Sequence, residues 1–165
     1  VDKNMTAILK QKLSSLVLPV PPKAASAAMS NISNKTFLIT PNEKKIKNIS
    51  FNFIDSVCSV RLETDTSFHH LRFGNGAWQT GETSRYGPSL VAAAKASFVG
   101  LPPLKINGSY NWKDENTVEL TLRYIESPHT EKITCHFEGN NISVVMENSF
   151  DYGKKKTELR GVLQE

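Results

Sequence analysis

The stretch YNWKDENTVELTLRYIE, residues 110–126, decides the fold of this chain. From Val118 to Tyr124 an apolar residue alternates with a polar one at every step. Because successive side chains of a β-strand point to opposite faces, this alternation predicts a strand with one dry face and one wet face. The side chains of the dry face must contact a packed core, a ligand or another protein.

The same period of two recurs along most of the chain after residue 34. It predicts strands at residues 35–40, 48–55, 57–64, 68–73, 106–112, 117–126, 130–138, 141–149 and 157–164. Gly, Pro, Asn, Asp and Ser separate these strands, and the short connections favour antiparallel neighbours. An open sheet of this size would expose long edges, so we predict a mainly β protein that closes as an antiparallel barrel of about 8–10 strands.

The middle of the chain, residues 79–108, is less regular. It combines a loop rich in Gly, Pro and Ser with a run of small residues, SLVAAAKASFVG, at 89–100. This composition is compatible with a strand, a short helix or neither, so the pattern does not choose between them.

The N-terminal part has a different period. Residues 4–17 place Ile8, Leu9 and Leu13 at helical spacing, which predicts a short amphipathic helix. The prolines of LPVPP, residues 18–22, remove backbone donors and end the helix. The small residues of KAASAAMSN, residues 23–31, favour a connector.

We therefore divide the chain into a helix with a linker rich in Pro and Ala, residues 1–31, and a barrel domain, residues 32–165. The chain begins VDKNMTAILK, without an initiator Met or a segment resembling a signal peptide. This beginning favours a piece of a longer protein.

Composition and charge exclude several classes of function. The chain has 39% hydrophobic and 22% charged residues, which is typical of a globular domain, and no apolar run approaches the roughly 20 residues that span a bilayer. The net charge is +4, but the short basic runs at 43–47 and 153–158 stand beside turn residues and acids, without aromatic residues on which bases could stack. We expect neither a membrane span nor a nucleic-acid partner.

Cys58 and Cys135 are the two cysteines of the chain. Both fall in phase with apolar neighbours on predicted strands, which favours buried free thiols. A cross-strand disulfide is the alternative if the protein is exported, and the sequence does not choose between the two.

The histidines do not form a predicted metal site. His69 and His70 are adjacent on a strand and therefore point to opposite faces. The same reasoning separates Cys135 from His136, so the two cannot form a nucleophile and base pair. We predict no metal, no cofactor and no catalytic residue in this chain.

Four aromatic residues are the candidate ligand-binding residues: Trp78, Tyr110, Trp112 and Tyr124. Aromatic side chains at strand ends and barrel mouths can stack on a ligand. They can equally fill the barrel, because small barrels need bulky side chains to avoid voids.

Three segments together resemble a known module. They are ISNKTFLITPNEKKIKNISFNF (32–53), FGNGAWQTGET (73–83) and YNWKDENTVELTLRYIESPHTEKITCHFEGNNISVVM (110–146). In this order, the three segments are similar to the C-terminal lipocalin-like domain that follows the catalytic domain in many bacterial serine hydrolases of the beta-lactamase and penicillin-binding-protein class. The most specific parts are Trp112 with the following turn and RYIESP hairpin, and CHFEGNNISV (135–144). Residues 9–22 resemble the helix and linker that join the two domains.

The resemblance implies a lipocalin-like accessory barrel whose partner is a catalytic serine hydrolase domain in the same parent chain. It also implies an extracytoplasmic location, periplasmic or secreted, if the parent is typical of the class. The catalytic motifs of that class are not in this chain: no serine has a lysine three places on, and KKT (155–157) continues with Glu158 in place of glycine.

These observations lead to two main hypotheses of function. The first is a non-catalytic accessory domain that packs on the catalytic domain or an oligomer partner and shapes substrate access. The second is an independent module that binds a small apolar ligand. The second predicts an open barrel interior lined by Phe51, Phe53, Leu120, Leu122, Ile133 and Phe137. A third hypothesis is that the module only solubilises or oligomerises its parent.

Overall fold

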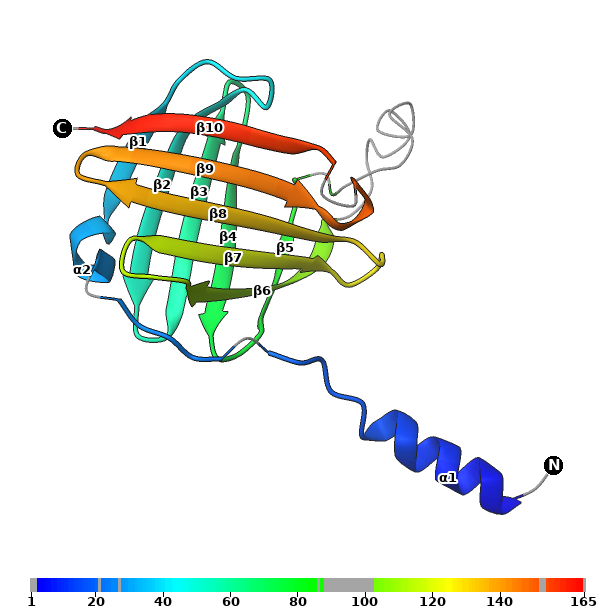
Figure 1. Ribbon diagram of the computed structural model, residues 1–165. Helices are drawn as coiled ribbons and strands as arrows, with labels where there is room; N and C mark the ends of the chain where they lie inside the picture. Colours follow the sequence, from blue (N-terminus) through cyan, green and yellow to red (C-terminus); the bar gives the residue numbers. More distant parts are fainter. Residues whose placement is uncertain are drawn as a thin grey trace.

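The computed structural model describes residues 3–20, 22–26, 28–85, 87, 103–151 and 154–164. Within these residues the chain forms two helices, ten strands and one 3₁₀ turn (Figure 1). The helices are α1 (Lys3–Ser14) and α2 (Ala28–Ile32). The strands are β1 (Lys35–Ile39), β2 (Ile46–Ile54), β3 (Val57–Thr64), β4 (Phe68–Asn75), β5 (Gln79–Thr83), β6 (Leu104–Trp112), β7 (Thr117–Tyr124), β8 (Thr130–Glu138), β9 (Asn141–Asn148) and β10 (Lys156–Leu163).

All nine strands predicted from the period of two are present. The tenth strand, β5, lies in the segment for which the pattern gave no prediction. It is hard to recognise in the sequence because only five residues pair with β6 and Gly81 interrupts their alternation. Residues 88–102 of that segment lie outside the described residues. The strand β2 begins earlier than predicted, at Ile46, because a bulge between Ile46 and Asn48 extends the ladder with β3.

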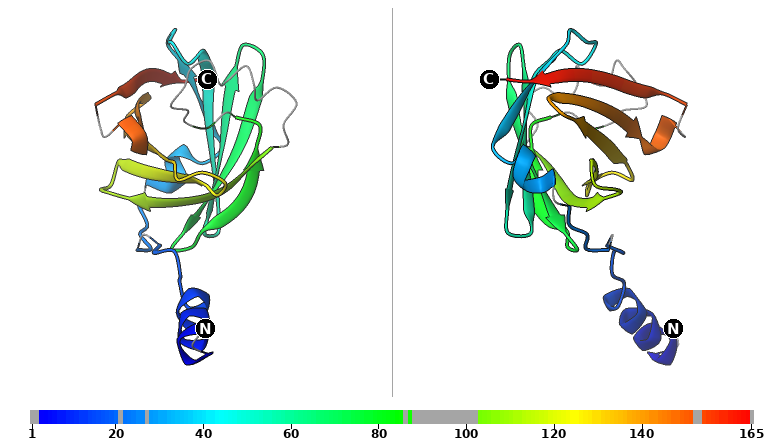
Figure 2. Two further views of the ribbon diagram at one scale, coloured as in Figure 1. Left: turned by 90° about the vertical axis from the view of Figure 1, so that its right-hand side faces the viewer. Right: turned by 60° about the vertical axis from the view of Figure 1, so that its left-hand side comes forward.

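The strands form one sheet in the order β4-β3-β2-β1-β10-β9-β8-β7-β6-β5. All neighbours in this order are antiparallel, and β1 pairs with β10, so the first and last strands are joined in the middle of the sheet. A short parallel contact between β4 and β6, at Gly74 with Ser109 and Asn75 with Tyr110, closes the sheet on itself. The predicted antiparallel barrel is confirmed (Figure 2).

Gly108 permits the closure between β4 and β6. A Cβ atom at this position would overlap the backbone carbonyl oxygen of Arg72 and would stand 3.0 Å from the Phe73 ring. The two strands can approach this closely only because glycine has no side chain.

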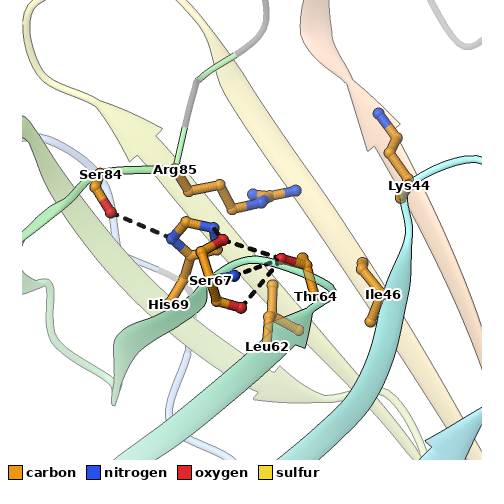
Figure 3. Close-up of a pocket in the computed structure, with 8 residues that line it drawn as sticks. All are labelled: Lys44, Ile46, Leu62, Thr64, Ser67, His69, Ser84 and Arg85. Carbon is orange, nitrogen blue, oxygen red and sulfur yellow. Dashed lines mark hydrogen bonds between the residues drawn. The ribbon is translucent and has the colours of Figure 1, made fainter. Parts of the chain in front are cut away.

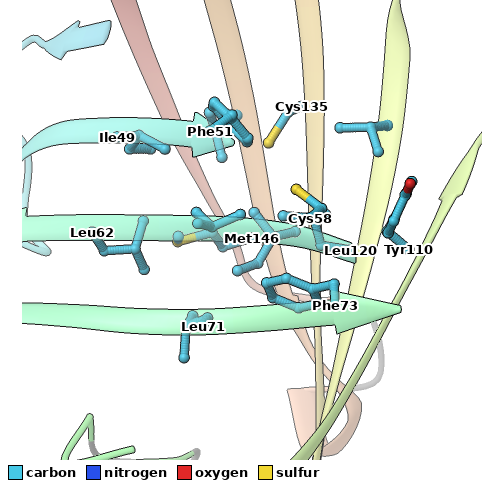
Figure 4. Close-up of a cluster of buried hydrophobic side chains, with 14 of the residues drawn as sticks. Ile49, Phe51, Cys58, Leu62, Leu71, Phe73, Tyr110, Leu120, Cys135 and Met146 are labelled. Atoms are coloured by element: carbon cyan, nitrogen blue, oxygen red, sulfur yellow. The ribbon is translucent and has the colours of Figure 1, made fainter. Parts of the chain in front are cut away.

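The barrel interior is filled by the inward positions of the alternating strands. The fully buried side chains include Phe51, Phe73, Tyr110 and Leu120 (Figure 4). Phe37 is also fully buried. Towards one end of the barrel, the rings of Phe37, Phe51 and Phe137 pack against one another with centroids 5.4–6.1 Å apart. The dry face of the opening stretch therefore faces a packed core over most of its length.

The barrel has two different ends. At the helix end, which we define by α2, the segment before β1 covers the strands: Ile32 is buried, and Asn75 exchanges two hydrogen bonds with the backbone of Ala24, at 3.0 and 2.6 Å. The hydroxyl of Ser26 donates to the carbonyl oxygen of Glu115 at 2.6 Å. Residues predicted to be a connector thus contain a helix and contact the barrel, because Ile32 and its neighbours find an apolar surface there.

Helix α1 lies away from the barrel (Figure 1). It ends at Ser14, somewhat earlier than the predicted residue 17, and its apolar side chains are exposed, including Ile8, Leu9 and Leu13. The amphipathic pattern predicted this helix correctly. Among the described residues, the barrel does not cover its apolar side.

Candidate ligand site at the pocket end of the barrel

A pocket of about 360 Å³ lies at the end of the barrel opposite α2, which we call the pocket end. Its lining residues are Lys44, Ile46, Leu62, Thr64, Ser67, His69, Ser84 and Arg85 (Figure 3). They come from the β1–β2 connection and the start of β2, from the end of β3, the β3–β4 turn and the start of β4, and from the residues that follow β5. The volume lies within the range of pockets that hold small molecules, at its lower side.

The apolar floor of the pocket is made by Ile46 and Leu62, which are both buried. Leu62 follows the inward phase of β3, whereas Ile46 reaches the interior because of the bulge in β2. The extra residue in the bulge is Lys47, which points outward and forms an ion pair with Asp65 at 2.8 Å. The bulge therefore places an isoleucine in the pocket and a lysine in water.

A polar cluster forms one side of the pocket around His69. One ring nitrogen, Nε2, lies 3.3 Å from the Ser67 hydroxyl, and the other, Nδ1, lies 3.4 Å from the Ser84 hydroxyl (Figure 3). Burial, with a smaller effect of the Arg85 charge, lowers the pKa of His69 below its ordinary value of 6.5. The imidazole is therefore neutral at neutral pH and offers one donor and one acceptor.

A buried ion pair crosses the pocket end. Arg85 Nη2 donates to Glu131 Oε1 at 2.7 Å, and Nη1 donates to Oε2, so the contact is bidentate. The two side chains are only 15% and 5% exposed. Burial alone would lower the pKa of the Arg85 guanidinium, but the charge and hydrogen bonds of Glu131 outweigh this effect and raise it. The pair joins the segment after β5 to β8, across the ends of two intervening strands.

Tyr124 lies beside this ion pair. Its side chain is 4% exposed, and its hydroxyl has no partner of good hydrogen-bond geometry among the described residues. A Cβ atom built on Gly87 would be 2.9 Å from the Tyr124 ring, so the backbone of Gly87 lies against that ring. Burial is the main cause of the raised pKa of Tyr124, and its hydroxyl stays protonated.

The four aromatic residues predicted to bind a ligand do not form one site. Tyr110 and Trp112 are buried at the helix end, where the Phe53 ring lies 5.6 and 6.0 Å from them. Trp78 is half-buried on the outer surface, where its Nε1 donates to the carbonyl of Leu18 at 3.3 Å. Of the four, Tyr124 is the one beside the pocket.

Trp78 also contacts the outward face of β7. The guanidinium of Arg123 stands 5.4 Å from the centre of its indole ring, which is a cation–π arrangement. These contacts give Trp78 a packing role between the start of β5, β7 and the segment that leads from α1. The position of Trp78 does not bring it towards the pocket.

Sequence reasoning missed Arg85 and Glu131. Arg85 belongs to the irregular middle of the chain, where no pattern indicates the direction of a side chain. Glu131 had a readable signal: it shares the inward phase of Ile133, Cys135 and Phe137, and an acid at an inward position requires a buried partner. Its partner lies 46 positions away in the sequence and could not be identified by pattern.

The polar side chains of the pocket form one hydrogen-bonded cluster. His69 stands between two hydroxyl groups, whereas Glu131 makes its bidentate contact with Arg85. Among the described residues, no three His, Cys, Asp or Glu side chains are placed to hold a metal ion. Cys58 and Cys135 are free, buried in the core, and have raised pKa values because of that burial (Figure 4).

Comparison with known proteins gives structural neighbours only. No protein-family model matches the chain, and no curated protein matches it by sequence. In the part of the chain that the structure describes, no helix has the length and apolar character required to cross a membrane.

Three of the structural neighbours align over almost the whole of their own length. A Schistosoma mansoni fatty-acid-binding protein, solved in complex with arachidonic acid, aligns with 84% of this chain and 100% of its own, at a TM-score of 0.58 and 10% identity. The Caenorhabditis elegans lipid binding protein 8 aligns with 86% of this chain and 100% of its own, at a TM-score of 0.55 and 9% identity. A fatty-acid-binding protein from Manduca sexta aligns with 79% of this chain and 98% of its own, at a TM-score of 0.51 and 9% identity. These similarities show that the chain has the β-barrel fold of these proteins.

Proposed function

We propose that this barrel is a binding module for a small ligand with a largely apolar body, which it holds at the pocket end. The observation that carries the proposal is the pocket of about 360 Å³, with an apolar floor of Ile46 and Leu62 and a rim of hydrogen-bonding side chains. This combination of apolar lining and a few convergent polar groups is typical of small-molecule sites.

The structural neighbours support the same proposal. They are fatty-acid-binding and lipid-binding proteins, and one of them was solved with arachidonic acid. The interior differs from the open one that the ligand hypothesis predicted: none of the six residues named for it lines this pocket, and Phe51 and Phe137 pack against each other. The proposed ligand therefore occupies one end of the barrel, above a packed core.

The proposal is tested by titrating the protein with an uncharged dye whose fluorescence increases in apolar surroundings. We expect saturable binding that the variant Thr64→Phe weakens at least about tenfold, because the ring would fill the pocket. Thr66→Phe is the matched control, since Thr66 is exposed in the turn that follows β3 and does not line the pocket. Absence of saturable binding, or equal effects of the two variants, would contradict the proposal.

We also propose that the module itself does not convert its ligand. This is supported by the bidentate contact that engages both carboxylate oxygens of Glu131 with Arg85, and by the two hydroxyl partners of His69. A chromogenic ester and a β-lactam test it: the purified chain should give no turnover above buffer. Turnover that disappears in His69→Gln or Ser84→Ala would contradict this.

A second candidate function is the accessory role beside a serine hydrolase domain. The observation that favours it is α1, whose apolar side chains Ile8, Leu9 and Leu13 are exposed and need a covering surface. Sedimentation of the chain with and without residues 1–31 tests whether this helix mediates association. A parent chain with a Ser-x-x-Lys helix upstream of Val1 would support the accessory role, and a parent without one would contradict it.

A further inference from the structure

The cations of the pocket decide which head group a ligand can have. Two cationic side chains line it, Lys44 and Arg85. Lys44 is exposed to water, where a charge contributes little to binding because solvent and salt screen it. Arg85 is the buried cation and would be the stronger anchor for an anionic head group.

Arg85 is already neutralised by Glu131. Both Nη atoms donate to the two carboxylate oxygens, so these donors are already engaged in the ion pair. A ligand carboxylate would have to stand beside Glu131, where the like charges repel, or displace it. Displacement would leave Glu131, which is 5% exposed, buried without a counter-charge.

A neutral head group meets a different environment. The rim offers the imidazole of His69 and the hydroxyl groups of Thr64, Ser67 and Ser84, all within one connected cluster. Because burial keeps His69 uncharged at neutral pH, the cluster adds no cation, and it can both donate to and accept from a hydroxyl or amide group.

Resting on the proposed function, we propose that the pocket selects a ligand with a neutral, hydrogen-bonding head group, such as an alcohol or a primary amide, over the carboxylate of the same chain length. The Arg85–Glu131 pair is the element that rejects the carboxylate. A barrel in which the same arginine had no acidic partner would have the opposite preference.

The test compares decan-1-ol, decanamide and decanoate by displacement of the bound uncharged dye at neutral pH, with the full chain. We expect the alcohol and the amide to displace the dye with affinities at least about tenfold higher than decanoate. In Glu131→Gln the side chain keeps its shape but Arg85 gains a free charge, so decanoate affinity should rise at least about tenfold and become the highest of the three.

Two controls separate the ion pair from other causes. Arg85→Gln combined with Glu131→Gln removes both charges and should retain the preference for the neutral ligands. Lys44→Gln removes the exposed cation and should leave the order of affinities unchanged. The fold of each variant is checked by circular dichroism, and the wild-type comparison remains decisive if a variant does not fold.

The possible failures are distinguishable. If the wild-type chain binds neither the dye nor any ligand, the proposed function itself fails. If the dye binds and decanoate displaces it at least as well as the alcohol and the amide, or if none of the three displaces it, the head-group proposal is overturned while the site remains. If Glu131→Gln folds and still prefers the neutral ligands, the role given to the ion pair is overturned.

Discussion

Glu131 shows how one residue can define the character of a site. It occupies an inward position of β8, where its neighbours in the same phase are Ile133 and Cys135. A buried carboxylate is tolerated when it is paired and hydrogen-bonded, and the bidentate contact with Arg85 supplies both conditions. The pair therefore occupies the pocket end at the expense of apolar packing.

We predict that replacing only one member of the Arg85–Glu131 pair destabilises the protein, whereas replacing both does not. Arg85→Met should lower the free energy of unfolding by about 3–5 kcal/mol, because it leaves Glu131 buried without a counter-charge. The double variant Arg85→Met/Glu131→Leu should be near the wild type, since apolar side chains of similar volume replace both charges. Urea denaturation measures the free energy of unfolding of the single and the double variant. Equal losses in the single and double variants would show that the pair is not coupled.

The stability of the protein should also depend on the protonation of His69. Since burial lowers its pKa in the folded state, the unfolded chain takes up the proton first as the pH falls through about 6.5. Protonation therefore favours unfolding, and stability decreases from about this pH downward until the folded state is protonated too. Urea denaturation above and below this pH should show a smaller decrease in His69→Gln than in the wild type. Identical pH dependence of the two proteins would contradict the prediction.

At the scale of single elements, two irregularities shape the barrel. The bulge in β2 turns Ile46 into the pocket and Lys47 towards Asp65 in the solvent. Gly108 lets β6 approach β4, so that the parallel contact can close the sheet. Both are positions at which the regular period of two does not describe the strand.

The closure predicts unequal effects of two glycine substitutions. Gly108→Ala should lower the free energy of unfolding by about 2 kcal/mol, because the new methyl group overlaps the Arg72 carbonyl and must push β4 and β6 apart. Gly81→Ala is the matched control on β5, where the nearest atom to an added Cβ is 3.9 Å away, on Ile106. It should change stability by less than about 1 kcal/mol. A comparable loss in both variants would mean that the close approach at Gly108 is not the cause.

At the scale of the whole molecule, the barrel and α1 are connected by a segment with two roles. Residues from Leu18 onward contact the barrel through Trp78 and Asn75, and Ile32 closes the helix end. Helix α1 contributes no apolar burial to the barrel, since its large apolar side chains are exposed.

This organisation predicts the outcome of two truncations. Removal of residues 1–17 should change the free energy of unfolding of the barrel by less than about 0.5 kcal/mol. Removal of residues 1–34 should lower it by at least about 3 kcal/mol, because the burial of Ile32 and the hydrogen bonds between Ala24 and Asn75 are lost. Thermal and urea denaturation of the two truncated chains provide the measurement. A large loss in the shorter truncation would show that α1 does pack on the barrel.

Alternation by itself determined the nine regular strands and the closed antiparallel sheet, because the period of two is a local property of the backbone and a closed sheet is the way to bury one face of so many strands. The buried phases of Cys58 and Cys135 and the opposite faces of His69 and His70 were readable in the same way.

The tertiary structure alone decided the site. The pairing of Arg85 with Glu131 joins residues 46 positions apart, and the bulge at Lys47 and the placement of Tyr124 beside the pocket depend on neighbours from other strands. The separation of Trp112 from Tyr124, at opposite ends of adjacent strands, likewise follows from register. Such contacts are set by the closure of the barrel, which brings distant segments together, and no local period of the sequence contains that information.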